Sequence, residues 1–140
     1  MDTATNYSSS DYNGFRPNPG ADVSFIWKSP DFEKAADFAG KRVDRRFRSL
    51  AEYSKATGQD VHSVSLDYDI FESVSAPAAG DPGRLHDAKD SDFRLRAGSK
   101  AVDAGMILPN VNDGYHGRLP DLGAYERGEA VPHYGPRKSR

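Results

Sequence analysis

The pattern of hydrophobic and polar positions predicts short strands separated by long polar loops. Residues 23–27 (VSFIW) alternate and are rich in aromatic and β-branched side chains, which is typical of a strand. Alternation at 61–72 and 93–96 predicts further strands, and 119–125 predicts a closing one. The stretches between them, such as 73–90, are rich in Ala, Pro, Gly and Asp and predict surface loops.

Two short helices are predicted within this β pattern. Ser49 and Glu52 match a capping box, in which the Ser hydroxyl accepts a backbone N–H of the first turn and the Glu side chain reaches back. Gly58 can adopt the left-handed conformation that ends a helix, so we expect a helix over 49–58. A Ser-Pro start and a stripe of apolar residues predict a second helix over 30–39. The predicted fold class is mainly β, loop-rich, with one or two short α-helices.

Composition indicates a chain that is poor in core-forming residues. It has 140 residues, which is the size of one domain, and only 36% of them are hydrophobic. The mean hydropathy is -0.75. A freestanding domain with so few apolar side chains would hardly offset the entropy lost on folding. We therefore expect the segment to pack on something larger and to be a fragment of a longer protein.

Charge and cysteine content exclude several classes of function. The chain has 19 basic and 21 acidic residues, a formal charge of -2, so it lacks the basic surface of a nucleic-acid-binding protein. It has no cysteine, which excludes disulfides, thiolate zinc sites and a cysteine nucleophile. No apolar run approaches the roughly 18 residues of a membrane span, and residues 1–13 do not have the pattern of a signal peptide.

Two aspartates with neighbouring glycines are candidates for tight turns. Asp103 lies between small residues ahead of Gly105, and Asp121 lies two residues before Gly123. Aspartate side chains in such turns commonly accept backbone N–H bonds. We favour this structural role for both aspartates over a metal-binding or catalytic role.

A metal site is not predicted. Asn110, Asn112 and Asp113 resemble a calcium loop in composition. The EF-hand pattern requires a Glu six residues after its Gly, and Pro120 occupies that position relative to Gly114. The four histidines form no zinc-binding pair, and no cofactor is evident from the chain.

Aromatic and histidine side chains are the candidates for contact with carbohydrate. Trp27 could stack on a sugar face, and Tyr115 with His116 could contact one from a loop. The alternatives, core packing for Trp27 and an ordinary surface loop for the other two, are favoured. The chain has no GxSxG motif for serine-hydrolase chemistry, and catalytic residues are not assigned.

Four stretches of the chain carry a family resemblance. Residues 92–105 (DFRLRAGSKAVDAG) and 121–126 (DLGAYE) resemble the paired signature that closes bacterial right-handed parallel β-helix proteins of the pectate-lyase-like superfamily. This module is called the choice-of-anchor Q domain when a sorting signal follows it. Residues 10–14 (SDYNG) resemble the rung that often ends such helices, and residues 49–63 (SLAEYSKATGQDVHS) resemble the segment that follows it.

The resemblance implies the last rung or rungs and the C-terminal cap of a right-handed parallel β-helix. It implies one module, divided into a terminal rung and loop (1–28), a helical insertion (29–60), capping strands and loops (61–127) and an irregular tail (128–140). It also implies an exported parent, extracellular or on the cell surface. The implied partners are the upstream β-helix rungs of the same protein and polysaccharide. The parent could hold calcium, but nothing in this chain supports it.

Two departures from the family pattern limit what the resemblance implies. Ala97 and Lys100 stand where the signature usually has Pro. No apolar span or sorting motif follows Glu126, which makes secretion better supported than surface attachment.

Two functions remain open from the sequence. We favour a non-catalytic capping or structural module of an exported β-helix protein that binds or processes polysaccharide. The alternative is a part of a polysaccharide lyase or glycoside hydrolase whose catalytic residues lie mostly upstream. In both cases the segment alone is expected to be inactive.

Overall fold

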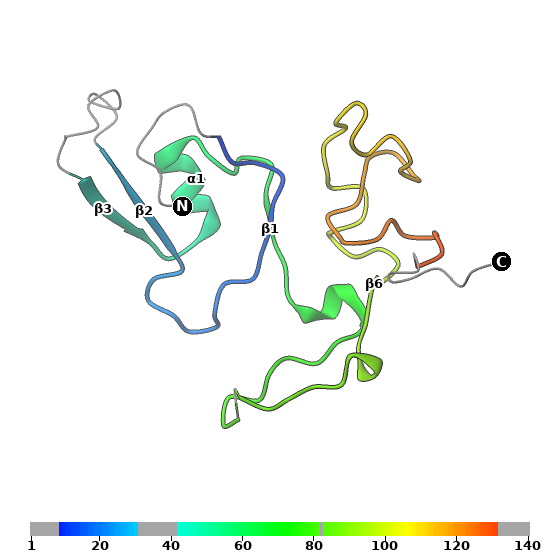
Figure 1. Ribbon diagram of the computed structural model, residues 1–140. Coiled ribbons are helices and arrows are strands. Elements are labelled where there is room, and N and C mark those ends of the chain that lie inside the picture. Colours follow the sequence, from blue (N-terminus) through cyan, green and yellow to red (C-terminus); the bar gives the residue numbers. More distant parts are fainter. Residues whose placement is uncertain (1–8, 31–41, 82, 132–140) are drawn as a thin grey trace. The chain divides into compact units, whose positions relative to one another are not determined.

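The computed structural model describes residues 9–30, 42–81 and 83–131, which belong to two compact units (Figure 1). The first unit ends at Asp67 and the second begins at Tyr68. Each unit has its own strands and its own buried residues.

An antiparallel ribbon forms the main sheet of the first unit. Strand β2 (Phe25–Pro30) pairs with strand β3 (Arg42–Phe47) along the whole length of both (Figure 1). The side chains of β2 alternate: Phe25 and Trp27 are buried, whereas Ile26 between them is exposed. This is the period of two that a half-buried strand requires.

The helix of the first unit begins and ends at the residues that the sequence indicates. Helix α1 (Leu50–Thr57) has Ser49 as its N-cap, and Ser49 Oγ accepts a hydrogen bond from Glu52 N at 3.2 Å. Glu52 reaches back to Arg48 N, one residue before the cap, at 2.9 Å. Gly58 has φ 68° and ends the helix in the left-handed conformation.

Aromatic side chains form the core of the first unit. Tyr53 on α1 stacks on Phe25 of β2, with ring centroids 5.4 Å apart, and meets Phe47 of β3 edge-on at 5.7 Å. Trp27 lies at 6.2 Å from the same ring. Such pairs add about 0.5–1.5 kcal/mol each beyond their burial. The helix is therefore held by packing against the ribbon, since a helix of 8 residues is marginal alone.

A two-residue parallel pair joins the start of the first unit to its end. Strand β1 (Gly14–Phe15) pairs with β4 (Val64–Ser65). The pairing does not continue far, because Pro17 has no N–H to donate to a neighbouring strand.

The second unit is mostly loops around a short antiparallel pair. Strand β5 (Phe71–Ser73) pairs with β6 (Asp92–Leu95) across a register irregularity. Two 3₁₀ turns, Tyr68–Ile70 and Ala88–Asp90, precede these strands. Among the described residues of this unit, the buried apolar side chains are Ile70, Leu95 and Ala101.

The predicted fold class is wrong. The described residues show three separate two-stranded sheets and no rung of a parallel β-helix. A β-helix needs each strand to pair in parallel with the rungs on both sides, whereas β2 pairs antiparallel with β3, and β5 pairs antiparallel with β6. The one parallel pair, β1 with β4, is two residues long.

Two other expectations about elements need comment. The predicted closing strand at 119–125 is wrong, because this stretch forms bends and no strand. The predicted helix at 30–39 falls on residues outside the described ones, except Pro30, which ends β2.

Candidate functional site

A buried carboxylate, Asp60, organises the loops of the first unit. Asp60 follows α1, is 2% exposed and has φ 55°, a left-handed conformation that Asp tolerates. Its Oδ1 accepts hydrogen bonds from Ser10 Oγ at 3.0 Å, Asn13 Nδ2 at 2.8 Å and Ser63 Oγ at 2.8 Å. The backbone N–H of Asp60 also donates to Ser10 O at 2.7 Å. One side chain thus joins segments that lie 50 residues apart in the sequence.

A second carboxylate, Asp11, holds the same two segments together. Its Oδ1 accepts the backbone N–H groups of His62 (2.7 Å) and Tyr12 (3.0 Å), and its Oδ2 lies 2.7 Å from His62 Nδ1. The ring of Tyr12 stacks on the imidazole with centroids 4.9 Å apart. Burial opposes ionisation of Asp11, but the hydrogen bonds from His62 and Tyr12 outweigh it and hold its pKa below the ordinary value.

A pocket of about 410 Å³ lies beside Asp60. Its described lining contains three aromatic rings and several polar groups, and among these residues the one charged group is the carboxylate of Asp60. Burial raises the pKa of Tyr53, and the nearby charge of Asp60 raises it further. The residues around the pocket are Ser10, Asn13, Phe15, Ser24, Phe25, Ile26, Tyr53 and Asp60.

A pair of carboxylates organises the second unit in the same way. Asp121 is 9% exposed; its Oδ1 accepts the backbone N–H of Asp103 and its Oδ2 accepts that of Arg127, both at 2.8 Å. Asp103 Oδ1 in turn accepts the N–H groups of Arg118 (2.7 Å) and Leu119 (3.1 Å). The bonds from Leu119 and Arg118 lower the pKa of Asp103.

Glu126 completes this network from the end of the 121–126 stretch. Its Oε1 accepts the backbone N–H of Asp121 at 2.9 Å, and its Oε2 lies 3.4 Å from His116 N. The N–H of Leu122 donates to Ala101 O at 2.8 Å. These bonds satisfy backbone groups that have no strand partner, so the stretch can fold without joining a sheet.

Gly105 and Gly123 in the network lie close to neighbouring atoms. Gly105 donates its N–H to Pro120 O at 2.7 Å, and a Cβ on Gly105 would also lie 2.7 Å from that oxygen. A Cβ on Gly123 would lie 3.0 Å from Leu95 Cδ1. Gly105 in particular is required by the close approach of two backbone segments.

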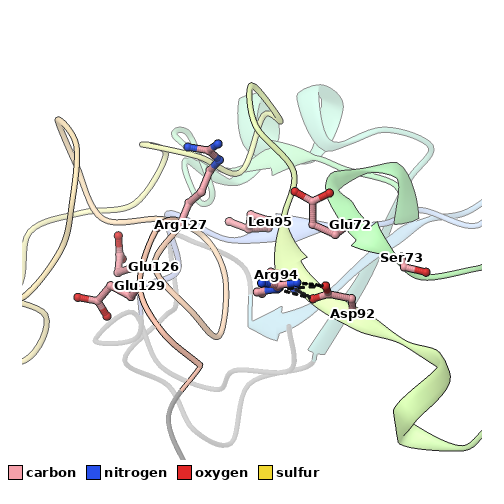
Figure 2. A pocket seen from close by; sticks show the side chains of 9 residues that line it. Glu72, Ser73, Asp92, Arg94, Leu95, Glu126, Arg127 and Glu129 are labelled. Carbon is pink, nitrogen blue, oxygen red and sulfur yellow. Dashed lines mark hydrogen bonds and ion pairs between the residues drawn. The ribbon is translucent and has the colours of Figure 1, made fainter.

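A hollow of about 500 Å³ in the second unit has charged walls (Figure 2). Arg94 Nε donates to Asp92 Oδ1 at 2.9 Å and to Oδ2 at 3.0 Å, and Figure 2 shows the two side chains facing each other. These bonds lower the pKa of Asp92 to about 2. Glu129, on another wall, pairs with His116 Nε2 at 2.9 Å. Because Asp92, Arg94 and Glu129 already have partners, the hollow is a weak candidate for a binding site.

The structure places the predicted carbohydrate contacts in different settings. Trp27 is 5% exposed within the aromatic core, so we do not propose it as a sugar contact. Tyr115 is half-buried, and His116 is exposed and bonded to Glu129. They lie in the second unit, whereas Trp27 lies in the first.

The asparagine-rich loop uses its side chains on its own backbone. Asn112 Oδ1 accepts Leu108 N at 2.7 Å, and Asp113 Oδ2 accepts Asn110 N at 2.8 Å. In the part of the chain that the structure describes, no group of three or more His, Cys, Asp or Glu side chains could hold a metal ion.

Sequence reasoning missed the organising roles of Asp60, Asp11 and Glu126. The signal was present, because these residues belong to the stretches 10–14, 49–63 and 121–126 that carry the family resemblance. What the sequence did not show was that the stretches bond to one another.

Comparison with known proteins gives no further identification. No family model, no curated protein and no solved structure matches the chain. No helix within the described residues is long and apolar enough to cross a membrane.

Proposed function

We propose that this chain is a non-catalytic structural module of a larger exported protein, and that the larger protein binds or processes polysaccharide. The observation that carries the proposal is the use of the second unit's aspartates. Asp121 has a backbone N–H on each oxygen, and Asp103 holds two more N–H groups. These carboxylates fix loops in place.

The same hydrogen bonds argue against a catalytic role for these two residues. A general acid needs a pKa raised toward the working pH, whereas the pKa of Asp103 is lowered. A nucleophile or base needs an oxygen within reach of the substrate, and both oxygens of Asp121 are already bonded to backbone N–H groups.

Exposed apolar side chains support packing against a neighbouring part of a larger protein. The loop at 106–111 carries Met106, Ile107, Leu108 and Val111, all exposed, with Val111 at 77%. Contiguous exposed apolar surface marks an interaction site more often than a free surface. The small core of each unit is consistent with a module that gains stability from its surroundings.

The family resemblance supports two further parts of the proposal, export of the larger protein and its contact with polysaccharide. Residues 92–105 and 121–126, which carry it, are joined through the Asp103–Asp121 bond. Export and contact with polysaccharide rest on this resemblance.

Incubation of the chain with pectate, alginate and chondroitin tests the absence of catalysis. We expect no release of reducing ends or of unsaturated uronates from any of the three. Turnover of one of them by the purified chain would contradict the proposal.

The packing part is tested with a hydrophobic dye whose fluorescence rises on exposed apolar surface. We expect the chain to bind the dye and the double variant Ile107→Ser, Val111→Ser to bind less. Leu85→Ser is the matched control, because Leu85 is 95% exposed but lies in a different loop. A monomer that unfolds cooperatively and binds no dye would contradict this part.

A further inference from the structure

The pocket beside Asp60 has an unusual combination of an aromatic lining and one buried carboxylate. Phe15, Phe25 and Tyr53 supply three rings, and Phe25 packs edge-on to Phe15 at 5.3 Å and stacked on Tyr53 at 5.4 Å. The volume of about 410 Å³ is within the range of small-ligand pockets. All the lining residues belong to the first unit.

The two oxygens of Asp60 are used unequally. All three side-chain donors, from Ser10, Asn13 and Ser63, bond to Oδ1. Among the described residues, no hydrogen bond reaches Oδ2. Asp60 is one of the residues that line the pocket.

Burying a charge is costly unless it has partners, and the three side-chain donors of this 2% exposed carboxylate all bond to one oxygen. The charge of Asp60 also reaches the aromatic lining, since it contributes to the raised pKa of Tyr53. The faces of aromatic rings attract cations. A ligand that carries one positive charge and an apolar body would satisfy both features.

We propose that this pocket binds an organic monocation, an alkylammonium or alkylguanidinium group, with its charge on Asp60 Oδ2 and its alkyl part against Phe15, Phe25 and Tyr53. The same chemistry is offered by a free amine and by a Lys or Arg side chain of a partner protein. An anionic ligand would meet the carboxylate and, among the lining residues that the structure describes, no cationic side chain. A neutral alcohol could donate a hydrogen bond to Asp60 but would bring no positive charge to it.

Asp60→Asn is the decisive variant, and its geometry favours folding. The amide side chain keeps an oxygen at the Oδ1 position for all three donors, and asparagine tolerates the φ of 55° at this position. The substitution removes the charge and places an NH₂ group where the cation would bind. Phe15→Leu removes one ring and keeps an apolar side chain. Phe93→Leu is its matched control, because Phe93 is an exposed aromatic of the second unit.

The experiment is a titration of the ¹⁵N-labelled chain, followed by the amide signals of the first unit. The probes are n-butylammonium chloride, n-butylguanidinium chloride and neutral 1-butanol. We expect the two cations to shift the signals of Asp60, Tyr53 and Phe15 saturably and 1-butanol to leave them in place. Asp60→Asn should weaken cation binding by about tenfold or more, which corresponds to about 1.4 kcal/mol. Phe15→Leu should weaken it about two- to fivefold, and Phe93→Leu should have no effect.

Three results would overturn the proposal. In the first, the chain binds 1-butanol as tightly as n-butylammonium. In the second, Asp60→Asn has a native spectrum and binds the cations as tightly as the unchanged chain. In the third, Phe15→Leu and Phe93→Leu change cation binding equally. If Asp60→Asn does not fold, two comparisons still test whether the pocket binds a cation: charged against neutral probes, and Phe15→Leu against Phe93→Leu. A short peptide with one Lys, compared with its norleucine analogue, then distinguishes a protein side chain from a free amine as the source of the cation.

Discussion

At the scale of single residues, what a carboxylate does depends on which of its oxygens is bonded. Asp103 accepts both of its backbone bonds on Oδ1, and Asp60 accepts all of its side-chain bonds on Oδ1. Asp121 instead uses Oδ1 for Asp103 N and Oδ2 for Arg127 N. Replacement by Asn keeps one oxygen and converts the other into an NH₂ donor. It should therefore disturb an Asp that is bonded through both oxygens more than one that is bonded through a single oxygen.

We therefore predict different losses of stability for two isosteric variants. Asp121→Asn should lower the free energy of unfolding by about 1–3 kcal/mol, because an NH₂ group would face a backbone N–H that loses its acceptor. Asp103→Asn should lower it less, because its Oδ1 still accepts both N–H bonds and only the charge is lost. Urea unfolding followed by circular dichroism measures both. Equal destabilisation by the two variants would contradict the assigned bonds.

Acidification is predicted to destabilise the chain through these carboxylates. The pKa of Asp92 is about 2 in the folded chain, and those of Asp11 and Asp103 are lowered, whereas an unfolded Asp titrates near 3.9. Between these values the unfolded chain binds more protons, so the stability is fully present above about pH 4 and decreases as the pH falls toward about 2. The urea midpoint as a function of pH measures the effect. Asp11→Asn should show a smaller decrease, and a midpoint that rises on acidification would disprove the prediction.

At the scale of elements, the helix is defined by local residues and the strand pairs are not. Ser49 and Gly58 bound α1 because capping depends on neighbours within one or two turns. Strand β3 was missed, since its sequence RVDRRF has few apolar residues and gains its pairing from β2. Strand pairing is long-range, which is why a resemblance in short stretches did not give the sheet topology.

The caps of α1 lead to a prediction at this scale. Ser49→Ala should cost about 1 kcal/mol because the N–H of Glu52 loses its acceptor. Gly58→Ala should cost about 1–2 kcal/mol because a Cβ is strained at positive φ. Gly80→Ala is the control, since it has open space and no positive φ. The free energy of unfolding should be higher for the control than for either cap variant. If Gly80→Ala and Gly58→Ala are equally stable, the left-handed cap at Gly58 is contradicted.

At the scale of the whole molecule, the chain consists of two units with separate carboxylate networks. The turn residues Asp103, Gly105, Asp121 and Gly123 could be predicted from the sequence because turn chemistry is local, whereas the bond that joins Asp103 to Asp121 could not. The pocket at Asp60 could not be predicted, because its lining comes from residues 10 to 60, far apart in sequence.

The two units are predicted to respond separately to substitution. Trp27 is the one tryptophan of the chain and lies in the first unit, so its fluorescence reports that unit alone. Asp121→Asn should leave the urea midpoint of Trp fluorescence unchanged, and Ser49→Ala should lower it. Equal shifts with both variants would show that the chain unfolds as one cooperative unit.

The bonds of Asp60 to Ser10 also close a loop of 50 residues in a chain without cysteine. In small secreted domains a disulfide commonly performs this closure. A loop that is closed by hydrogen bonds to a carboxylate is not opened by reducing agents. The entropic cost of closing a flexible loop grows only with the logarithm of its length, by about 0.6 kcal/mol for each doubling. Insertions between the two ends should therefore be tolerated well, whereas substitutions at Ser10 or Asp60 should not.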